Sequence, residues 1–101
     1  MDNNLYNLEY EKTILASIIF EPSKVEECQS LGLKAIHFYL PSFQKIYDVV
    51  LYLFENKVVD EEVIKNELGS SFDEQAMLEI LGANPASNIA FYIQKIKETY
   101  Q

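Results

Sequence analysis

Arginine and tryptophan are missing from this sequence of 101 residues, and cysteine and histidine occur once each, as Cys28 and His37. One residue of each kind is too few for a structural zinc site, which needs several Cys and His ligands. A single cysteine also excludes an internal disulfide. The first ten residues lack the basic segment and apolar core of a secretory signal. We therefore expect a cytoplasmic protein in which Cys28 is a small buried residue, since Glu26 and Glu27 beside it disfavour a reactive thiolate.

Glycine is also scarce, with residues only at positions 32, 69 and 82. A phosphate-binding loop of the form G-x-x-x-x-G-K-S/T needs two close glycines, and these lie 37 and 13 residues apart, which excludes such a loop. The D-x-D-x-D-G spacing of a calcium loop is missing as well. No apolar run approaches the roughly 18 residues of a membrane span. The sequence thus predicts no cofactor, no metal and no membrane segment for this chain.

Positive charge is in short supply. Sixteen acidic residues face eight lysines, which gives a net charge of −8. Nucleic-acid-binding proteins gather Lys and Arg to displace counterions from phosphates. We expect this domain to repel DNA on average and to suit a basic protein partner. Any contact with single-stranded DNA would depend on local lysines such as Lys95 and Lys97.

Apolar residues at helical spacing are abundant, and 49% of the sequence is hydrophobic. No stretch alternates apolar and polar residues for long enough to indicate a strand. The pattern predicts an all-α fold, a compact bundle of about six helices in a single domain over residues 1–101. The helices are expected in the stretches 7–20, 23–31, 41–57, 60–68, 71–81 and 84–100, with a short helical turn within 33–40.

Capping residues mark several helix ends. Asn7 and Asp60 are predicted N-caps, and Ser23 and Ser71 begin S-x-x-E capping boxes. Each of the three glycines follows a helical stretch, and glycine is common directly after the C-terminal end of a helix. Apolar residues surround the helix at 41–57 on most sides, so we expect it to be the buried central helix.

His37 is the one residue from which a Ser-His-Asp type of catalysis could be built. It stands beside Phe38 and Tyr39, a setting more typical of a packing corner or a cap. The seven tyrosines and six phenylalanines fall on the helical faces without basic neighbours, which indicates core packing rather than base stacking. The residues by themselves therefore predict a non-catalytic helical domain that binds protein.

The opening stretch "NLEYEKTILASIIFEP" resembles the start of the N-terminal domain of DnaB-type replicative DNA helicases. In that family an E-x-E pair precedes V-L-G-x-L/I-L/I-x-x-P. The matching residues here are Glu9, Glu11, Ile14, Leu15, Ala16, Ile18, Ile19 and Pro22.

Three later stretches continue the resemblance in the family's order, over about residues 5–98. "HFYLPSFQKIY" is similar to D-F-Y-x-P-x-H-x-x-I-F, with His37 in place of Asp and Phe43 in place of His. "VVDEEVI" is similar to V-D-x-x-T-V/L. "NPASNIAFYIQKI" is similar, with one spacing adjustment, to x-P-S/T-A-x-N-I/V-x-x-Y-A-x-I-V.

The resemblance implies a role in DNA replication. In this family the N-terminal domains form a collar, a trimer of dimers, above six ATP-driven motor domains, and the collar recruits primase. The Walker A loop belongs to a motor domain downstream, so ATP, Mg²⁺ and most of the DNA contacts would belong to the parent helicase. This chain would be the non-catalytic collar domain, with primase and other copies of itself as partners.

The resemblance also implies candidate contact residues. The last helix would be the truncated start of a dimerising helical hairpin, so we expect an exposed pairing seam of Ile89, Ile93, Ile96 and Tyr100. Glu9 and Glu11, expected outside the apolar seam of the first helix, are candidates for docking primase.

Two alternatives stay open at the level of sequence. One is the helicase-binding domain of a primase, which has a similar helical fold. The other is an acidic adaptor or DNA mimic that blocks a DNA-binding protein. A Walker A loop in the reading frame after Gln101 would favour the helicase over both.

Overall fold

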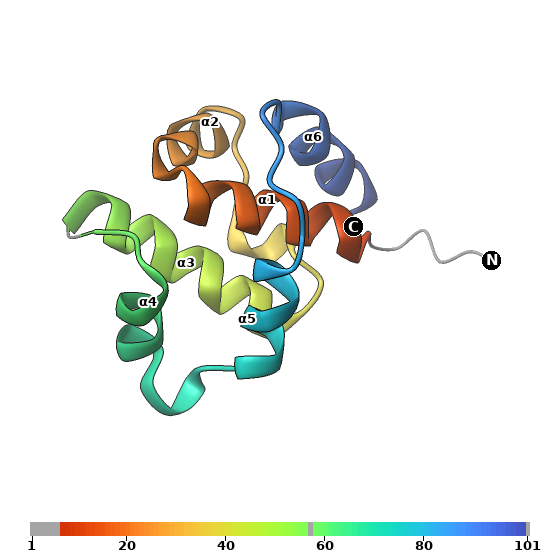
Figure 1. The fold of residues 1–101 in the computed structure, drawn as a ribbon. Coiled ribbons are helices and arrows are strands. Elements are labelled where there is room, and N and C mark those ends of the chain that lie inside the picture. Colours follow the sequence, from red (N-terminus) through yellow and green to blue (C-terminus); the bar gives the residue numbers. More distant parts are fainter. Residues whose placement is uncertain (1–6, 57, 101) are drawn as a thin grey trace.

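The computed structural model describes residues 7–56 and 58–100, and every regular element in this part of the chain is helical (Figure 1). The α-helices are α1 (Leu8–Phe20), α2 (Val25–Ser30), α3 (Pro41–Asn56), α4 (Glu61–Leu68), α5 (Glu74–Leu81) and α6 (Ala90–Thr99). Short 3-10 turns occur at η1 (Pro22–Lys24), η2 (Ala35–His37) and η3 (Gly69–Ser71). The predicted all-α bundle of about six helices, with a helical turn before α3, is confirmed. Residues 1–6, Lys57 and Gln101, which the predicted domain and helix boundaries included, lie outside the described residues.

No helix among the described residues is long and apolar enough to cross a lipid bilayer.

The central helix is α1. Its residues Ile14–Ile18 are all buried, and α3, α5, α6 and η1 pack against it (Figure 1). The expectation that the helix at 41–57 is central is wrong. On α3 the buried residues fall on one face, and Tyr52 on another side is 46% exposed. Further apolar residues of α3, such as Val49 and Leu51, are only half-buried, whereas the five consecutive residues Ile14–Ile18 of α1 are covered on every side.

Two predicted N-caps are confirmed. The Asn7 Oδ1 atom accepts a hydrogen bond from the Tyr10 backbone N–H at 3.3 Å. The Asp60 Oδ2 atom accepts one from the Glu62 backbone N–H at 3.0 Å. Such bonds satisfy N–H groups that have no partner within the helix. The starts of α1 and α4 are therefore fixed by their own sequence.

The two predicted serine capping boxes are wrong. Ser23 lies inside η1, because Pro22 already begins a helical turn. Ser71 lies inside η3, and Asp73 caps α5 instead by accepting from the Ala76 backbone N–H at 3.1 Å. The Ser42 hydroxyl donates to Asp73 at 2.6 Å and lowers the pKa of that carboxyl, with the Ala76 N–H adding to the effect. Asp73 thus links the starts of α3 and α5.

His37 forms a packing corner, as predicted. Its Nδ1 atom accepts a hydrogen bond from the Lys34 backbone N–H at 2.9 Å, which holds the turn η2. Its ring meets the Tyr100 ring edge to face, with the centroids 5.0 Å apart. Burial lowers the pKa of His37, and the positive charge of Lys97 adds to the effect. The imidazole therefore joins η2 to the end of α6.

Cys28 is a buried free thiol, also as predicted. Burial raises its pKa to about 12, and the charge of Glu27 contributes to the shift. The Tyr47 hydroxyl, in the same buried region, donates to the Leu33 carbonyl oxygen at 2.7 Å. A thiol with this pKa stays protonated at neutral pH and acts as a small apolar side chain.

Two polar side chains are buried on α1, and each binds the backbone of an irregular segment. Both carboxylate oxygens of Glu11 accept from the Tyr39 N–H, at 3.1 and 3.2 Å. The Ser17 Oγ atom accepts from the Ala86 N–H at 2.8 Å and donates to the Thr13 carbonyl oxygen at 2.6 Å. The central helix therefore fixes the segment before α3 and the segment before α6.

We predict that Glu11→Gln stabilises the domain at pH 8 but not at pH 5. Burial raises the pKa of Glu11 from 4.5 to about 7, against the opposing effect of the Tyr39 N–H. Between these values the folded state binds more protons than the unfolded state, so the Glu11 contribution to stability falls as pH rises through this window. Glutamine keeps the acceptor without the charge and should be more stable at pH 8 by roughly 1–3 kcal/mol.

Urea unfolding of both proteins between pH 5 and pH 8 measures this difference. The other acidic residues are common to the two proteins, so subtraction isolates Glu11. A difference in unfolding free energy that does not change with pH would contradict the prediction.

Candidate protein-docking surface

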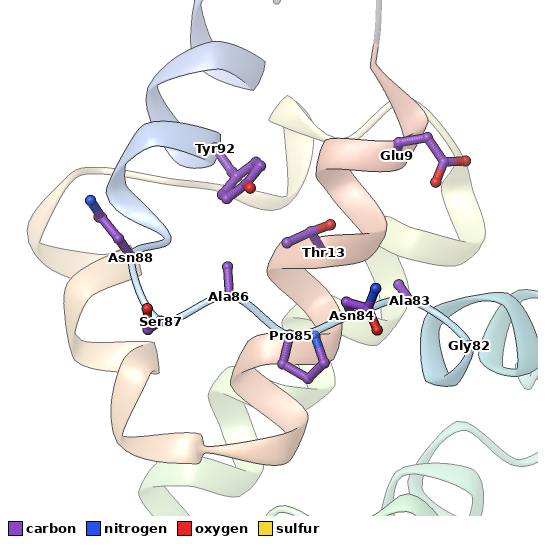
Figure 2. Close-up of a pocket in the computed structure, with 10 residues that line it drawn as sticks. All are labelled: Glu9, Thr13, Gly82, Ala83, Asn84, Pro85, Ala86, Ser87, Asn88 and Tyr92. Atoms are coloured by element: carbon purple, nitrogen blue, oxygen red, sulfur yellow. The ribbon is translucent and has the colours of Figure 1, made fainter.

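The segment 82–88 runs across α1 on its way from α5 to α6 (Figure 2). The surface is hollowed on both sides of this segment. The hydrogen bond from the Ala86 N–H to the buried Ser17 hydroxyl holds the middle of this segment. Lys24 supports it from η1 by donating to the Ser87 carbonyl oxygen at 2.9 Å. Both hollows therefore have walls that are fixed by contacts within the domain.

The first hollow, here called the polar hollow, has a volume of about 660 Å³. It lies between the first half of α1, the segment 82–88 and the start of α6 (Figure 2). Its charged lining residue is Glu9, and the side chains of Asn84, Asn88 and Tyr92 add hydrogen-bonding groups. A surface of this kind suits a cationic or hydrogen-bonding group of a partner protein.

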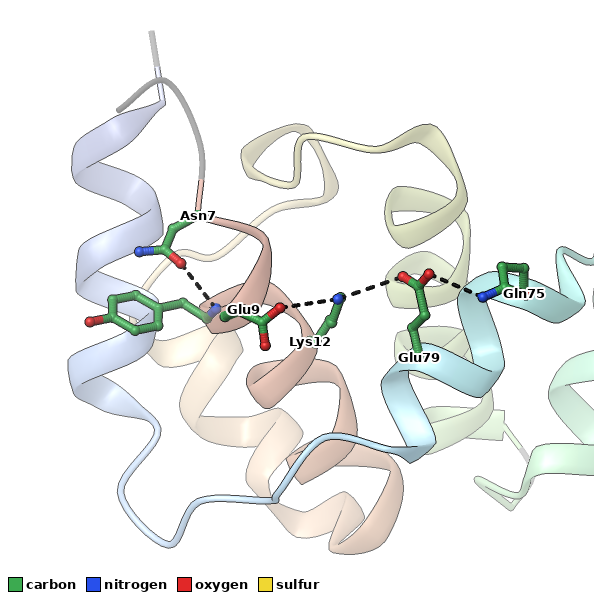
Figure 3. A network of polar contacts seen from close by, with 6 residues as sticks. Asn7, Glu9, Lys12, Gln75 and Glu79 are labelled. Carbon is green, nitrogen blue, oxygen red and sulfur yellow. Dashed lines mark hydrogen bonds and ion pairs between the residues drawn. The ribbon is translucent and has the colours of Figure 1, made fainter. Parts of the chain in front are cut away.

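Glu9 is held at the rim of the polar hollow by an ion pair. Its carboxylate lies 3.2 Å from the Lys12 ammonium group, which also lies 3.6 Å from Glu79 on α5. Gln75 donates to Glu79 at 3.2 Å and completes a row of contacts between α1 and α5 (Figure 3). The hydrogen bond to Glu9 raises the pKa of Lys12, and Glu79 adds to the effect. The side chain of Glu9 nevertheless remains 79% exposed.

The second hollow, here called the apolar groove, has a volume of about 640 Å³. It lies where the end of α1, the start of α4 and the end of α5 meet. Phe20, the last residue of α1, is 78% exposed beside it. The residues that line the groove are Ala16, Ile19, Phe20, Val59, Asp60, Glu61, Leu81, Ala83 and Pro85.

Only one of the two glutamates proposed for partner contact lies at the surface. Glu9 is exposed, but Glu11 is 1% exposed and its carboxylate is bound to the Tyr39 backbone. The expectation that Glu11 lies outside the apolar seam is wrong. Residues two apart on a helix do not share a face, so an E-x-E pair at the start of α1 places one carboxylate outward and one inward.

The expectation of an exposed seam on α6 is also wrong for its three isoleucines. Ile89, Ile93 and Ile96 are each 0% exposed, because α6 packs against α1 and α2. Tyr100 is 40% exposed, and its ring lies against His37. A helical period shows which residues share a face, but not whether the same domain or another copy covers that face.

The residues around the two hollows offer hydrogen-bonding and apolar contact surfaces. Among the described residues, no group of three or more His, Cys, Asp or Glu side chains is placed to hold a metal ion. His37 is occupied in capping η2. Sequence reasoning missed Phe20 and the segment 82–88. The available signal was a large aromatic residue at position 20, off the seam of α1 and directly before the Glu21–Pro22 helix stop.

Comparisons with protein families, with known sequences and with solved structures all match the same kind of domain. The family model for the DnaB-like helicase N-terminal domain matches residues 3–98. The replicative DNA helicases DnaB of Helicobacter pylori strains J99 and 26695 are 30% and 29% identical to this chain over 90 residues. These matches cover 86% of this chain and 18% of each relative, so the chain spans less than a fifth of their length.

A solved structure of the N-terminal domain of DnaB helicase from Helicobacter pylori has the same fold. It matches with a TM-score of 0.81 and 28% sequence identity, over 89% of this chain and 75% of that one. That structure was described together with the interactions of the H. pylori domain with primase. Because the family model covers nearly the whole chain, this protein belongs to the DnaB-like helicase N-terminal domain family.

Proposed function

We propose that this chain is the non-catalytic N-terminal collar domain of a hexameric replicative DNA helicase, where it mediates subunit association and recruits primase. The observation that carries the proposal is the structural likeness to the H. pylori DnaB domain, whose interactions with primase were described with its structure. The family match favours this role over a primase domain or an acidic adaptor. ATP hydrolysis with Mg²⁺ would take place in the motor domain of a cytoplasmic parent helicase.

The charges of the domain support a protein partner rather than DNA. Sixteen acidic residues face eight lysines. The two lysines considered for single-stranded DNA have contacts within the domain: Lys97 donates to the Leu31 carbonyl oxygen at 2.5 Å, and Lys95 lies 3.8 Å from Glu98. DNA contact would therefore fall mainly to the motor domain.

The polar hollow is the surface that we propose for primase. Glu9 is exposed at its rim, and the side chains of Asn84, Asn88 and Tyr92 lie around it (Figure 2). A carboxylate at the rim of an interface contributes to the association rate and to the choice of partner. Glu9 is thus suited to meet a basic group of primase, a role that buried Glu11 does not share.

Reversal of charge at Glu9 should weaken the binding of primase. Glu9→Lys in the full-length helicase is expected to raise the Kd for its own primase by about fivefold, a rim-charge effect near 1 kcal/mol. Fluorescence anisotropy with labelled primase measures this, and the loss should shrink at high salt.

Glu98→Lys is the matched control, because Glu98 is also an exposed acid paired with a lysine three positions away, but on α6. Equal Kd values for the Glu9 and Glu98 variants would contradict the proposed docking role of Glu9.

The isolated chain should be monomeric or a weak dimer. The apolar seam of α6 is buried in its own domain and offers no pairing surface, and copies with a net charge of −8 repel each other. Light scattering after gel filtration should give a mass near the 11.7 kDa of one chain at micromolar concentration. A stable hexamer formed by residues 1–101 alone would be incompatible with this account.

A further inference from the structure

The apolar groove exposes large side chains that the domain does not need for its own core. Phe20 is 78% exposed, Leu81 is 42% exposed and Val58, next to the lining residue Val59, is 62% exposed. Phe20, Val59 and Leu81 all line the groove, and they come from three segments that are far apart in the sequence. Apolar side chains gathered in this way, with polar residues at the rim, are typical of a protein interaction site.

The groove has the size of an ordinary binding site and an apolar lining with acidic residues at its edge. Its volume of about 640 Å³ lies within the roughly 300–1,000 Å³ of ordinary ligand sites. An amphipathic helix can lay one face into such a groove through side chains at positions i, i+3, i+4 and i+7. Phe20 and Leu81, at the ends of α1 and α5, would contact that face.

The charges around the groove select the partner. Asp60 and Glu61 line it, and none of its described lining residues is a lysine. Glu61 is exposed and has no ion-pair partner among the residues that the structure describes. A second copy of this chain, with twice as many acids as bases, would meet these carboxylates with like charge.

We propose that the apolar groove docks an amphipathic helix of a partner protein, with large apolar residues on Phe20 and Leu81 and Lys or Arg beside Asp60 and Glu61. This is a second docking site, separate from the polar hollow, since Glu9 does not line it. The segment 82–88 lies between the two, and Ala83 and Pro85 belong to both walls. The domain could therefore hold two partner elements on opposite sides of that segment.

A synthetic helical peptide of about four turns tests the proposal. It carries Leu and Phe on one face and Lys along both edges, and a matched peptide has Glu in place of every Lys. Nuclear magnetic resonance titration of the ¹⁵N-labelled chain should show that the Lys peptide shifts the amide signals of Ile19, Phe20 and Leu81. The Glu peptide should bind at least about tenfold more weakly.

Variants of the chain identify the contacts. Phe20→Ala should lower the affinity of the chain for the Lys peptide by about tenfold, and Glu61→Lys should lower it by about threefold. Tyr52→Ala, which removes another exposed aromatic side chain but does not line the groove, should leave the affinity unchanged. Phe20 and Glu61 are both exposed, so the variants should keep the fold, which circular dichroism verifies.

Several results would overturn the proposal: no binding of the Lys peptide at millimolar concentration, equal binding of the Glu peptide, an affinity that Phe20→Ala does not change, or shifts confined to the polar hollow. Self-association of the chain that depends on Phe20 would identify a second copy as the occupant and would overturn it too. Primase is absent from this experiment, so its failure would leave the collar proposal intact.

Discussion

Polar side chains buried on a helix must find their hydrogen-bond partners within the protein, and α1 carries two of them, Glu11 and Ser17. Glu11 accepts the backbone N–H of Tyr39, and Ser17 accepts that of Ala86. Each bond joins the central helix to a segment that has no helical hydrogen bonds of its own at that point. The buried apolar residues Ile14, Leu15, Ala16 and Ile18 of the same helix provide the surface against which α3, α5 and α6 pack. The remaining elements are thus positioned relative to α1.

This arrangement also determines where partners can bind. Ser17 holds the segment 82–88 across α1, and that segment separates the polar hollow from the apolar groove. Glu9 reaches the surface because Glu11, two residues later, faces inward. Phe20 reaches the surface because α1 ends there, beyond the part that the other helices cover. Both hollows are built on the ends of helices and on a segment that hydrogen bonds hold in place. Sites supported by rigid elements in this way keep a defined geometry.

The sequence was sufficient for the helical class, the helix count and the caps at Asn7 and Asp60, since these depend on local spacing and local hydrogen bonds. It was not sufficient for the identity of the central helix or for the exposure of Ile93 and Glu11. Those properties depend on which neighbours cover a face, and periodicity carries no information about neighbours. Phe20 escaped notice because a single apolar residue at a helix end leaves the helical period unchanged.

Hydrogen exchange of the native chain tests the central position of α1 most directly. The amides of Ile14–Ile18 should exchange only through global unfolding, with an opening free energy equal to that from urea denaturation. Amides near Tyr52, on the exposed side of α3, should exchange earlier through smaller openings. Exchange of the α1 amides through local opening, while α3 stays protected, would contradict the account.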